Sequence, residues 1–344
     1  MKVLLGMSGG LDSTYAARAL QEKAMEVEGA VLKMHEYTDV DGARRSAESL
    51  GIPLHVIDCT NDFLAVKNDL VSCYANGKTP NPCIICNREV KFKRLYDFAM
   101  ANGFDRIATG HYAKIVSYEH NGSTKQTFAR AIDSKKDQTY MLYRLPSYIV
   151  EKLLLPLADL EKSRVRELAM TAELSFDNKK SQEICFLPQG GHVSYVEQVV
   201  GMLSEGDFID DEGRTLGRHK GIAHYTIGQR KGLGIALGAR YFVTRIDPND
   251  NTVTLSDAPK LSTKIYLDST CFLGIDASDM EQGLHCQVKI RYLAPAVDAL
   301  ARLMPDSSVV LELSTPVASV APGQSAVLYD GDVLLGGGFI VKSE

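Results

Sequence analysis

The sequence predicts an α/β protein in three parts: an amino-terminal doubly wound parallel sheet, a small central β-rich domain and a carboxyl-terminal antiparallel β-barrel. Three observations predict this fold. The amino-terminal part alternates short β-rich runs with helical patterns, as βαβ units do. Glycine becomes frequent from 201 to 238, without a long helical pattern. From about 263 onward, short β-rich runs are separated by turn residues, as in a small barrel. We expect domains at 1–200, 201–262 and 263–344.

The individual elements follow from hydrophobic periodicity. In the first domain we expect strands at 2–7, 28–34, 54–58 and 106–109, and helices at 11–23, 41–50, 61–75, 86–102, 138–145 and 161–172. Asn121-Gly122, between two β-rich runs, predicts a hairpin turn. In the last domain we expect strands at 287–292, 308–313, 325–329 and 333–341.

Composition argues against a membrane protein and against general disorder. The 344 residues are 45% hydrophobic and 24% charged, with a mean hydropathy of −0.10 and a net charge of −5. The most apolar region, 141–160, is interrupted by charged residues and prolines, so it lacks the roughly 18 uncharged residues of a spanning helix. The first eight residues hold too few apolar side chains for a signal peptide. We expect a cytoplasmic protein.

A local basic segment stands out against the negative net charge. Between 214 and 246 there are seven Lys and Arg residues and no Asp or Glu. Such a segment is typical of a surface that binds nucleic acid. The alternative is a solvated region whose counter-charges come from elsewhere in the fold. The basic residues are Arg214, Arg218, Lys220, Arg230, Lys231, Arg240 and Arg245.

A glycine-rich hexapeptide joins the first predicted strand to the first predicted helix: Ser8-Gly9-Gly10-Leu11-Asp12-Ser13. The glycines let the backbone turn tightly, and N–H groups of the turn and of the helix start converge on one point, where a polyphosphate can bind. The loop lacks the Gly-Lys-Ser/Thr ending that would supply a lysine for a γ-phosphate. Asp12 instead offers a carboxylate for Mg²⁺. The alternative is an ordinary capped helix start.

Seven cysteines, an odd number, favour thiol chemistry or metal ligation over a disulfide scaffold. Cys83 and Cys86 form a Cys-x-x-Cys pair at a predicted loop-to-helix junction, where N–H groups and cations lower thiol pKa values. Cys185 lies in the segment 181–186. The alternatives are half of a zinc site, and buried structural cysteines such as Cys59, Cys73, Cys271 and Cys286.

The hexapeptide resembles the loop of the PP-loop ATP pyrophosphatase superfamily, which has an adenine-nucleotide α-hydrolase-like fold and adenylates a carbonyl or amide oxygen. Further motifs, in order along nearly the whole chain, resemble the tRNA-specific 2-thiouridylase family. They are Pro80-Asn81-Pro82 with Cys86-Asn87, 108–113, 136–140, 181–186, 225–233, Arg291-Tyr292 and 322–327.

The resemblance implies a role for each matching residue. ATP, with Mg²⁺ at Asp12, would adenylate O2 of the wobble uridine in the anticodon loop of tRNA. Cys185 would carry sulfane sulfur as a persulfide from a sulfur-relay protein or another sulfide donor, and Cys86 would release it by forming a transient disulfide. ATP would bind to Gly6, Met7, Ser8, Gly9, Gly10, Leu11, Asp12, Ser13, Met34 and Gly110. The tRNA would contact Asn81, Pro82, Cys83, His111, Lys136, Asp137, Gln138, Arg291, Tyr292 and Gln324.

The chain departs from the family pattern at four places. Cys83 stands where many members have Asp, so that Cys83, Cys86 and Cys185 could ligate a 4Fe–4S cluster with one open iron. Lys180 replaces an acidic residue, and the segment after Met34 is shorter than usual. Ala239-Arg240-Tyr241 replaces Pro-Trp-Tyr. These changes are compatible with another sulfur donor or another RNA target.

Two other functions remain open. One is a related PP-loop ligase or synthetase that adenylates a small acid, which would release pyrophosphate without tRNA. The other is a non-catalytic RNA-binding or zinc-binding module that keeps the fold, which would bind tRNA without consuming ATP.

Overall fold

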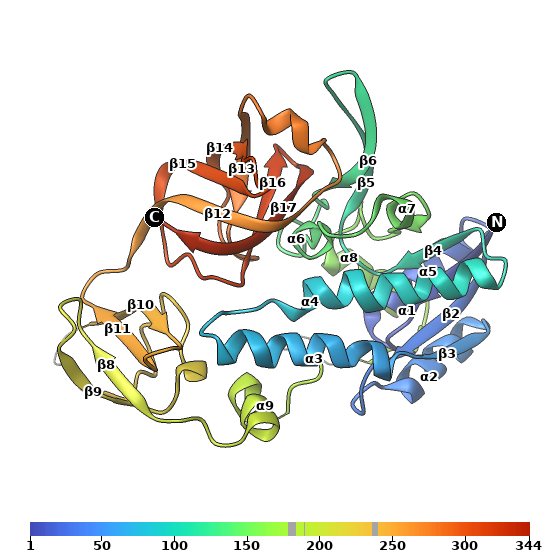
Figure 1. Cartoon of the computed structure of the whole chain (residues 1–344). Helices are drawn as coiled ribbons and strands as arrows, with labels where there is room; N and C mark the ends of the chain where they lie inside the picture. The colour runs from blue at the N-terminus through green and yellow to red at the C-terminus, as the bar shows by residue number, and fades with distance from the viewer. Residues whose placement is uncertain (178–183, 189, 236–239) are drawn as a thin grey trace.

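The amino-terminal part is built on a five-stranded parallel sheet. The computed structural model describes residues 1–177, 184–188, 190–235 and 240–344 (Figure 1). The strand order is β3-β2-β1-β4-β7, and each pair of neighbours is parallel. The bounds are β1 Lys2–Gly6, β2 Glu26–Lys33, β3 Leu54–Asp58, β4 Arg106–Thr109 and β7 Leu153–Leu154.

Helices cover both faces of this sheet, as the doubly wound prediction requires. Val3 and Leu5 of β1 pack in one core with Leu11 and Val165, whereas Leu4 packs in a second core on the opposite face. The alternation arises because successive strand residues point to opposite faces. The helices are α1 Leu11–Gln21, α2 Val40–Leu50, α3 Thr60–Ala75, α5 Phe92–Ala101, α6 Thr139–Leu142, α7 Ser147–Val150, α8 Lys162–Thr171 and α9 Gly191–Val200.

The helix predicted at 86–102 is two pieces rather than one, and a further short helix precedes it. A short α4, Pro82–Ile85, leads into a π-helical turn, Cys86–Lys91, and then into α5. Periodicity alone gives no sign of this turn, because its wider winding depends on tertiary packing. π-helical turns are rare and frequently lie at functional sites. The helix α9 was also not predicted.

The central part is a four-stranded sheet in the order β10-β11-β8-β9. Phe208, Tyr225 and Val253 are buried in its own small core. The strands are β8 Gly206–Ile209, β9 Thr215–His219, β10 Phe242–Asp247 and β11 Thr252–Ser256, and a 3-10 turn spans Ile222–His224.

The carboxyl-terminal part is an antiparallel barrel, which confirms the predicted fold class. Six strands follow in the order β12-β15-β14-β13-β16-β17, and pairing between β12 and β17 closes the barrel. A 3-10 turn, Ala277–Met280, precedes β13. The strands are β12 Leu261–Phe272, β13 Leu284–Lys289, β14 Val297–Leu303, β15 Val309–Ala318, β16 Ser325–Asp330 and β17 Val333–Ser343.

The predicted hairpin belongs to the amino-terminal part in sequence but extends the barrel sheet. Its strands are β5 Lys114–His120 and β6 Ser123–Ala129, and Asn121 and Gly122 have φ of 49° and 75°, as a tight hairpin turn requires. Ala129 pairs with Val333 of β17. The barrel therefore lies against the parallel-sheet part (Figure 1). No described helix has the length and apolar character needed to cross a membrane.

Candidate active site

The glycine-rich loop lies at the switch point of the parallel sheet. The chain passes from β1 to β2 on one side, whereas β4 joins β1 on the other side. Ligands bind at the carboxyl ends of strands where the order reverses in this way. The loop leaves the carboxyl end of β1, and α1 begins at Leu11 without a side-chain cap on its N-terminus. No side chain therefore caps this helix end, and its N–H dipoles can attract an anion.

Two glycines permit close backbone contacts around this loop. Gly9 has φ of +76°, and a Cβ there would lie 2.5 Å from the carbonyl carbon of Gly42. A Cβ on Gly110, at the end of β4, would lie 2.8 Å from the carbonyl carbon of Asp12. Any side chain at either position would push the loop away from its neighbours. The two predicted ATP residues Gly9 and Gly110 thus lie at the same site.

Hydrogen bonds within the loop fix its shape. The Ser8 N–H donates to Ser13 Oγ at 3.2 Å, and Ser13 Oγ donates to the Gly10 carbonyl at 3.1 Å. The Asp177 N–H donates to the Gly9 carbonyl at 2.9 Å. The loop is therefore shaped before any ligand binds, which lowers the entropic cost of binding.

Asp12 is paired with a lysine that lies far away in sequence. Lys162 Nζ lies 2.5 Å from Asp12 Oδ1, and the Tyr112 hydroxyl donates to the same oxygen at 2.9 Å. The loop itself contains no lysine, but α8 brings Lys162 to it from a distant part of the chain. Asp12 Oδ2 receives no hydrogen bond from the described residues.

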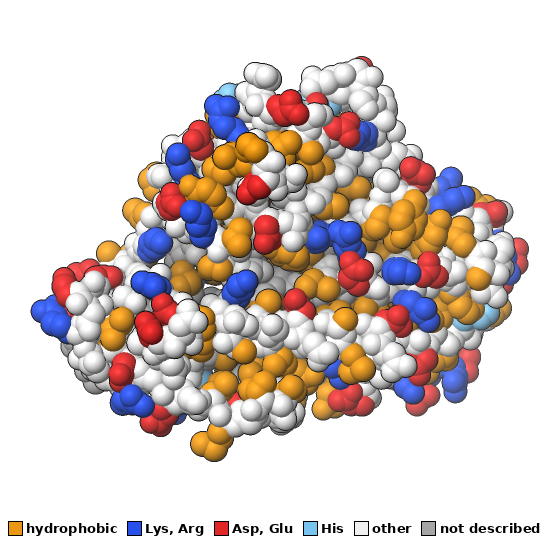
Figure 2. Space-filling model, viewed as in Figure 1, with side chains coloured by type: hydrophobic (Ala, Val, Ile, Leu, Met, Phe, Trp, Pro, Cys, Tyr) orange, Lys and Arg blue, Asp and Glu red, His pale blue; other side chains and the backbone are white. Residues whose placement is uncertain are grey.

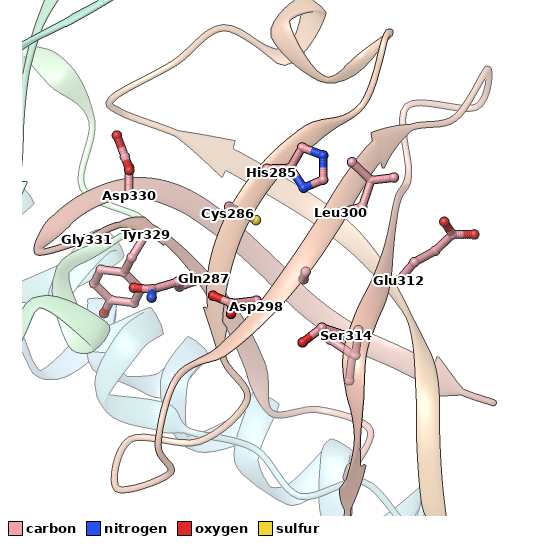
Figure 3. A pocket seen from close by; sticks show the side chains of 12 residues that line it. His285, Cys286, Gln287, Asp298, Leu300, Glu312, Ser314, Tyr329, Asp330 and Gly331 are labelled. Atoms are coloured by element: carbon pink, nitrogen blue, oxygen red, sulfur yellow. The ribbon is translucent and has the colours of Figure 1, made fainter.

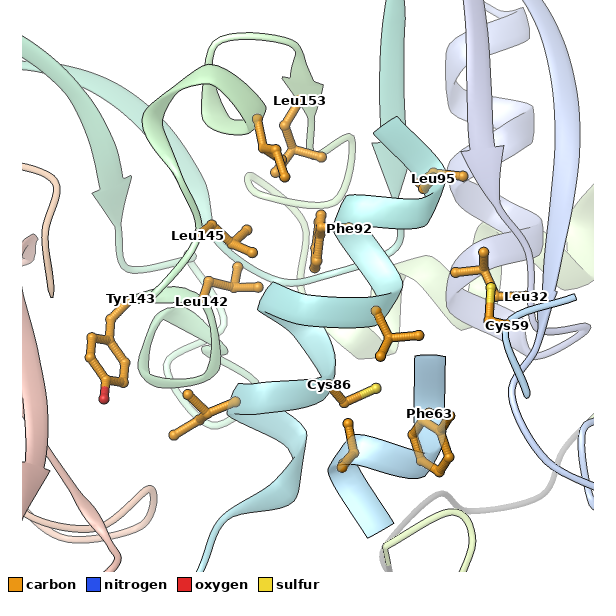
Figure 4. Packing of buried hydrophobic residues seen from close by; sticks show 14 of the residues in the cluster. Leu32, Cys59, Phe63, Cys86, Phe92, Leu95, Leu142, Tyr143, Leu145 and Leu153 are labelled. Carbon is orange, nitrogen blue, oxygen red and sulfur yellow. The ribbon is translucent and has the colours of Figure 1, made fainter. Parts of the chain in front are cut away.

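The cysteines occupy contrasting environments. Cys86 is buried and points toward Phe63 and the Cys59 side of the core, whereas Cys83 and Cys185 are exposed (Figure 4). Burial raises the pKa of Cys86 to about 12. Although Cys83 and Cys185 reach the surface, desolvation by the protein around them raises the pKa values of these two thiols as well. Cys86 Sγ lies 3.7 Å from Sδ of Met34, a predicted ATP residue just beyond β2. The thiol site therefore adjoins the nucleotide site.

Lys91 acts electrostatically on all three thiols. Its positive charge opposes the burial effect by lowering the pKa values of Cys83, Cys86 and Cys185. The π-helical turn has i to i+5 hydrogen bonding, so residues five apart such as Cys86 and Lys91 share a face, which an α-helix would not allow. Lys91 makes no ion pair with a described residue.

The three cysteines do not form a metal centre. Within the described ranges, no group of three or more His, Cys, Asp or Glu side chains is arranged to hold a metal ion. Cys83, Cys86 and Cys185 are therefore not placed as ligands of one 4Fe–4S cluster in this structure. Residues 181–183 of the Cys185 motif, Lys180 and Ala239 lie outside the described residues.

The predicted tRNA residues after β4 and β6 differ in exposure. Lys136 is exposed, whereas Asp137 is buried and accepts a hydrogen bond from Thr139 Oγ1 at 2.8 Å. Gln138 Oε1 accepts from the Tyr112 N–H at 2.9 Å. His111 Nδ1 lies 2.9 Å from Thr109 Oγ1, and burial lowers its pKa to about 3, so the ring is neutral. Of these four, Lys136 has the charge and exposure of a phosphate contact.

The predicted barrel residues connect the parts of the molecule. Arg291 donates to the carbonyl of Ile227 at 2.9 Å and to that of Ser319 at 2.6 Å. Tyr292 packs near Tyr140, with ring centroids 6.1 Å apart. Gln324 Nε2 donates to the Thr79 carbonyl at 2.8 Å. Gln324 therefore helps to place the loop that carries Asn81 and Pro82.

The basic segment is partly neutralised by acids that flank it. Arg214 pairs with Asp210 and Glu212, Arg218 with Asp207, and Arg245 with Asp247. On the face shown in Figure 2, Lys and Arg side chains alternate with Asp and Glu. Three of the seven cations are thus neutralised, by acids next to the segment in sequence rather than by residues from elsewhere in the fold. The other four are exposed and make no ion pair with a described residue: Lys220, Arg230, Lys231 and Arg240.

A cavity of about 620 Å³ opens in the barrel, away from these residues (Figure 3). His285, Asp298, Glu312 and Asp330 are among the side chains that line it, and it contains none of the predicted site residues. The chemistry predicted from the sequence therefore gathers at the edge of the parallel sheet rather than in this cavity.

Sequence reasoning missed three residues of the site: Tyr112, Lys162 and Lys91. Tyr112 follows His111 in the motif 108–113, so its position in that motif could have indicated that it belongs to the site. Lys91 follows Cys86 by five residues, but only the π-helical turn makes that spacing meaningful. Lys162 lies 150 residues from Asp12, and no local pattern connects the two.

Comparison with known proteins extends over the whole chain. Residues 1–189 match the tRNA methyl transferase HUP domain, 194–257 the tRNA methyl transferase PRC-barrel domain, and 262–340 the aminomethyltransferase beta-barrel domain. The tRNA-specific 2-thiouridylase of Clostridioides difficile is 40% identical over 99% of this chain and 98% of its own length. That of Clostridium acetobutylicum is 40% identical over 98% of this chain and 99% of its own. The chain thus belongs to the tRNA-specific 2-thiouridylase family.

Proposed function

We propose that this chain is a tRNA-uridine 2-sulfurtransferase of the cytoplasm that converts the wobble uridine of tRNA to 2-thiouridine. The observation that carries the proposal is the contact between the two predicted sites: Met34, expected to bind ATP, lies 3.7 Å from the sulfur of Cys86. An adenylated base held at the loop would therefore lie close to the thiol that completes sulfur transfer.

Adenylation comes first, because the C2 oxygen of uridine is a poor leaving group. O2 attacks the α-phosphorus of ATP, the bond from that phosphorus to the bridging oxygen breaks, and pyrophosphate leaves. The proton of N3 passes to solvent, so the base becomes an O2-adenylyl derivative. The start of α1, which no side chain caps, would bind the phosphates. Oδ2 of Asp12 would help to hold Mg²⁺, which supplies charge neutralisation when bound.

Sulfur transfer follows through a persulfide on Cys185. Its terminal sulfur attacks C2, AMP leaves, and the base is joined to Cys185 through a disulfide. Cys86 Sγ then attacks Cys185 Sγ, and the electron pair of the broken S–S bond forms the C2 thiocarbonyl. A Cys86–Cys185 disulfide remains, and an external dithiol must reduce it. The sulfane sulfur must come from a persulfide-bearing relay protein or a comparable donor.

The exposure of the thiols supports this division of roles. Cys185 is exposed, so a donor protein can reach it, whereas Cys86 is buried and its raised pKa keeps it protonated until the site rearranges. Cys83 is exposed beside Asn81 and Pro82, where the target base would enter. A base in a single-stranded anticodon loop can be turned out at modest cost.

The test uses the full chain, unmodified tRNA and ATP labelled at the α-phosphate. We expect tRNA-dependent AMP and pyrophosphate, and 2-thiouridine once a sulfide donor is added. Asp12→Ala should abolish AMP formation while leaving tRNA affinity within about twofold, because Asp12 lies at the nucleotide loop. Formation of ADP alone with every acceptor would overturn the proposal.

The same experiment separates the two other functions. Pyrophosphate release with a small acid and without tRNA would favour a ligase or synthetase. Binding of tRNA without ATP consumption, unchanged by Cys86→Ser or Cys185→Ser, would favour a binding module. The similarity to 2-thiouridylases over the whole chain supports neither alternative.

A further inference from the structure

Lys162 occupies a position where a lysine is electrostatically unfavourable. It is the first residue of α8, whose first turn contains no acidic residue, and a helix N-terminus carries about half a positive charge. Its Nζ reaches Asp12 in the first turn of α1, so two helix N-termini lie within the reach of one side chain. The charges of Asp12 and Lys162 cancel, so the ion pair leaves little net negative charge at the start of α1 to compensate the positive end of that helix.

The surrounding contacts hold Lys162 at this place. The Lys162 N–H donates to Asp133 Oδ2 at 3.0 Å, which fixes the start of α8. Val165 of α8 is buried in the same core as Leu11 of α1. The ammonium lies 5.9 Å from the centre of the Tyr112 ring. The helix start is therefore fixed, whereas the flexible stem of the lysine can still redirect its charge.

Both partners of the ion pair remain accessible to a ligand. The side chain of Lys162 is 28% exposed and that of Asp12 is 35% exposed. A partly exposed ion pair contributes little to stability, so stability alone does not explain a lysine here. ATP brings about four negative charges, and the loop itself contributes no cationic side chain.

We propose that Lys162 is a phosphate-binding residue of the ATP site, which Asp12 holds in place until the triphosphate enters. This inference rests on the proposed function, and it deepens it by naming the cation that faces the departing pyrophosphate. When ATP binds, the ammonium moves from Asp12 Oδ1 to the β- and γ-phosphate oxygens, and the released carboxylate becomes free for Mg²⁺.

The test measures nucleotide binding to the full chain without tRNA. Lys162→Met should weaken binding of ATP and of inorganic pyrophosphate about 10- to 100-fold, the effect of losing a charge-assisted hydrogen bond. Binding of AMP should change by less than about twofold, because AMP lacks the β- and γ-phosphates. Lys162→Arg should restore most of the ATP affinity. Lys162→Gln, which can still donate to Asp12, should behave like Lys162→Met.

Arg164→Met is the matched control. Arg164 lies on the same helix but pairs with Glu167 at 2.7 Å, and the variant should bind all three ligands as the unaltered chain does. Equal loss of ATP and AMP in Lys162→Met and Lys162→Gln would indicate a structural role and overturn the inference. Unchanged ATP binding in both variants, or no ATP binding by the unaltered chain, would also overturn it.

Failure of the proposed function has a different outcome. If the unaltered chain binds ATP and Lys162→Met loses ATP but not AMP, Lys162 is a phosphate-binding residue. Absence of tRNA thiolation by the same preparation would then contradict only the proposed sulfur transfer.

Discussion

At the scale of single residues, Cys86 and Cys185 are predicted to act in sequence. Cys86→Ser should leave the thiolated base joined to Cys185, because no thiol is present to break the connecting disulfide. We expect a covalent complex of protein and tRNA that survives denaturing electrophoresis and disappears on addition of a dithiol. Cys185→Ser should instead accumulate adenylated tRNA without a covalent complex.

Cys271→Ser provides the control for this pair. Cys271 is a partly exposed cysteine of β12, where it pairs with Gly337, and we expect normal thiolation. Thiolated tRNA at the normal rate from Cys86→Ser would remove Cys86 from the release step.

The charge of Lys91 should determine how readily the exposed thiol of Cys185 ionises. Its charge lowers the pKa of Cys185, so Lys91→Met should raise that pKa and reduce the thiolate fraction at pH 8. We expect Cys185 to be alkylated by iodoacetamide about three- to tenfold more slowly, equivalent to roughly half to one pKa unit. The rate should rise with pH in both proteins, because only the thiolate reacts. Peptide mass spectrometry measures the rate at this site.

Lys93→Met is the comparison for Lys91→Met. Lys93 is exposed, pairs with Asp97 at 2.7 Å and lies outside the π-helical turn. Its loss should leave the alkylation rate of Cys185 unchanged. Equal rates in the two variants would show that Lys91 does not act on the thiol.

At the scale of elements, the end of β4 must approach the start of α1 closely. Gly110→Ala would place a Cβ 2.8 Å from the backbone of Asp12, so the strand and helix must separate. We expect the free energy of unfolding to fall by about 1–3 kcal/mol and the affinity for ATP to fall at least about tenfold. Denaturant titration and equilibrium dialysis measure the two effects.

Gly103→Ala separates stability from site geometry. Gly103 has φ of +72° and no atom within 4 Å of an added Cβ. Alanine is strained at this backbone conformation, so the free energy of unfolding should fall by about 1 kcal/mol. The affinity for ATP should stay unchanged. Normal ATP binding by Gly110→Ala would show that this close approach does not shape the nucleotide site.

At the scale of the whole molecule, tRNA binding should depend on the unpaired cations of the central part. Arg230 and Lys231 are exposed and make no ion pair with a described residue. Replacing both with Gln should weaken tRNA binding and reduce the slope of log affinity against log salt by about 1–2. Filter binding at several salt concentrations measures the slope.

Arg214→Gln is the control within the same segment. Arg214 is already paired with Asp210 at 2.6 Å and with Glu212 at 2.7 Å, so its loss should leave the salt slope unchanged. An unchanged slope for the Arg230 and Lys231 variant would place the tRNA on another face.

Local patterns predicted much of the fold, because they depend on neighbouring residues. The strand at 54–58 and the strand at 106–109 have the expected bounds, and Asn121-Gly122 forms the hairpin turn. The strands β12 and β14 were not predicted, although they complete the barrel. A strand recognised only through its partners gives a weak signal in a single sequence.

The sequence by itself determined the glycine-rich loop, the cysteine pair and the order of the domains, because each is encoded by adjacent residues or by short-range periodicity. The tertiary structure alone decided that Lys162 joins Asp12, that the Cys86–Lys91 turn is π-helical, and that Arg291 and Gln324 connect separate parts. These features arise from packing between segments far apart in the chain. Their geometry depends on the whole fold, which no local pattern specifies.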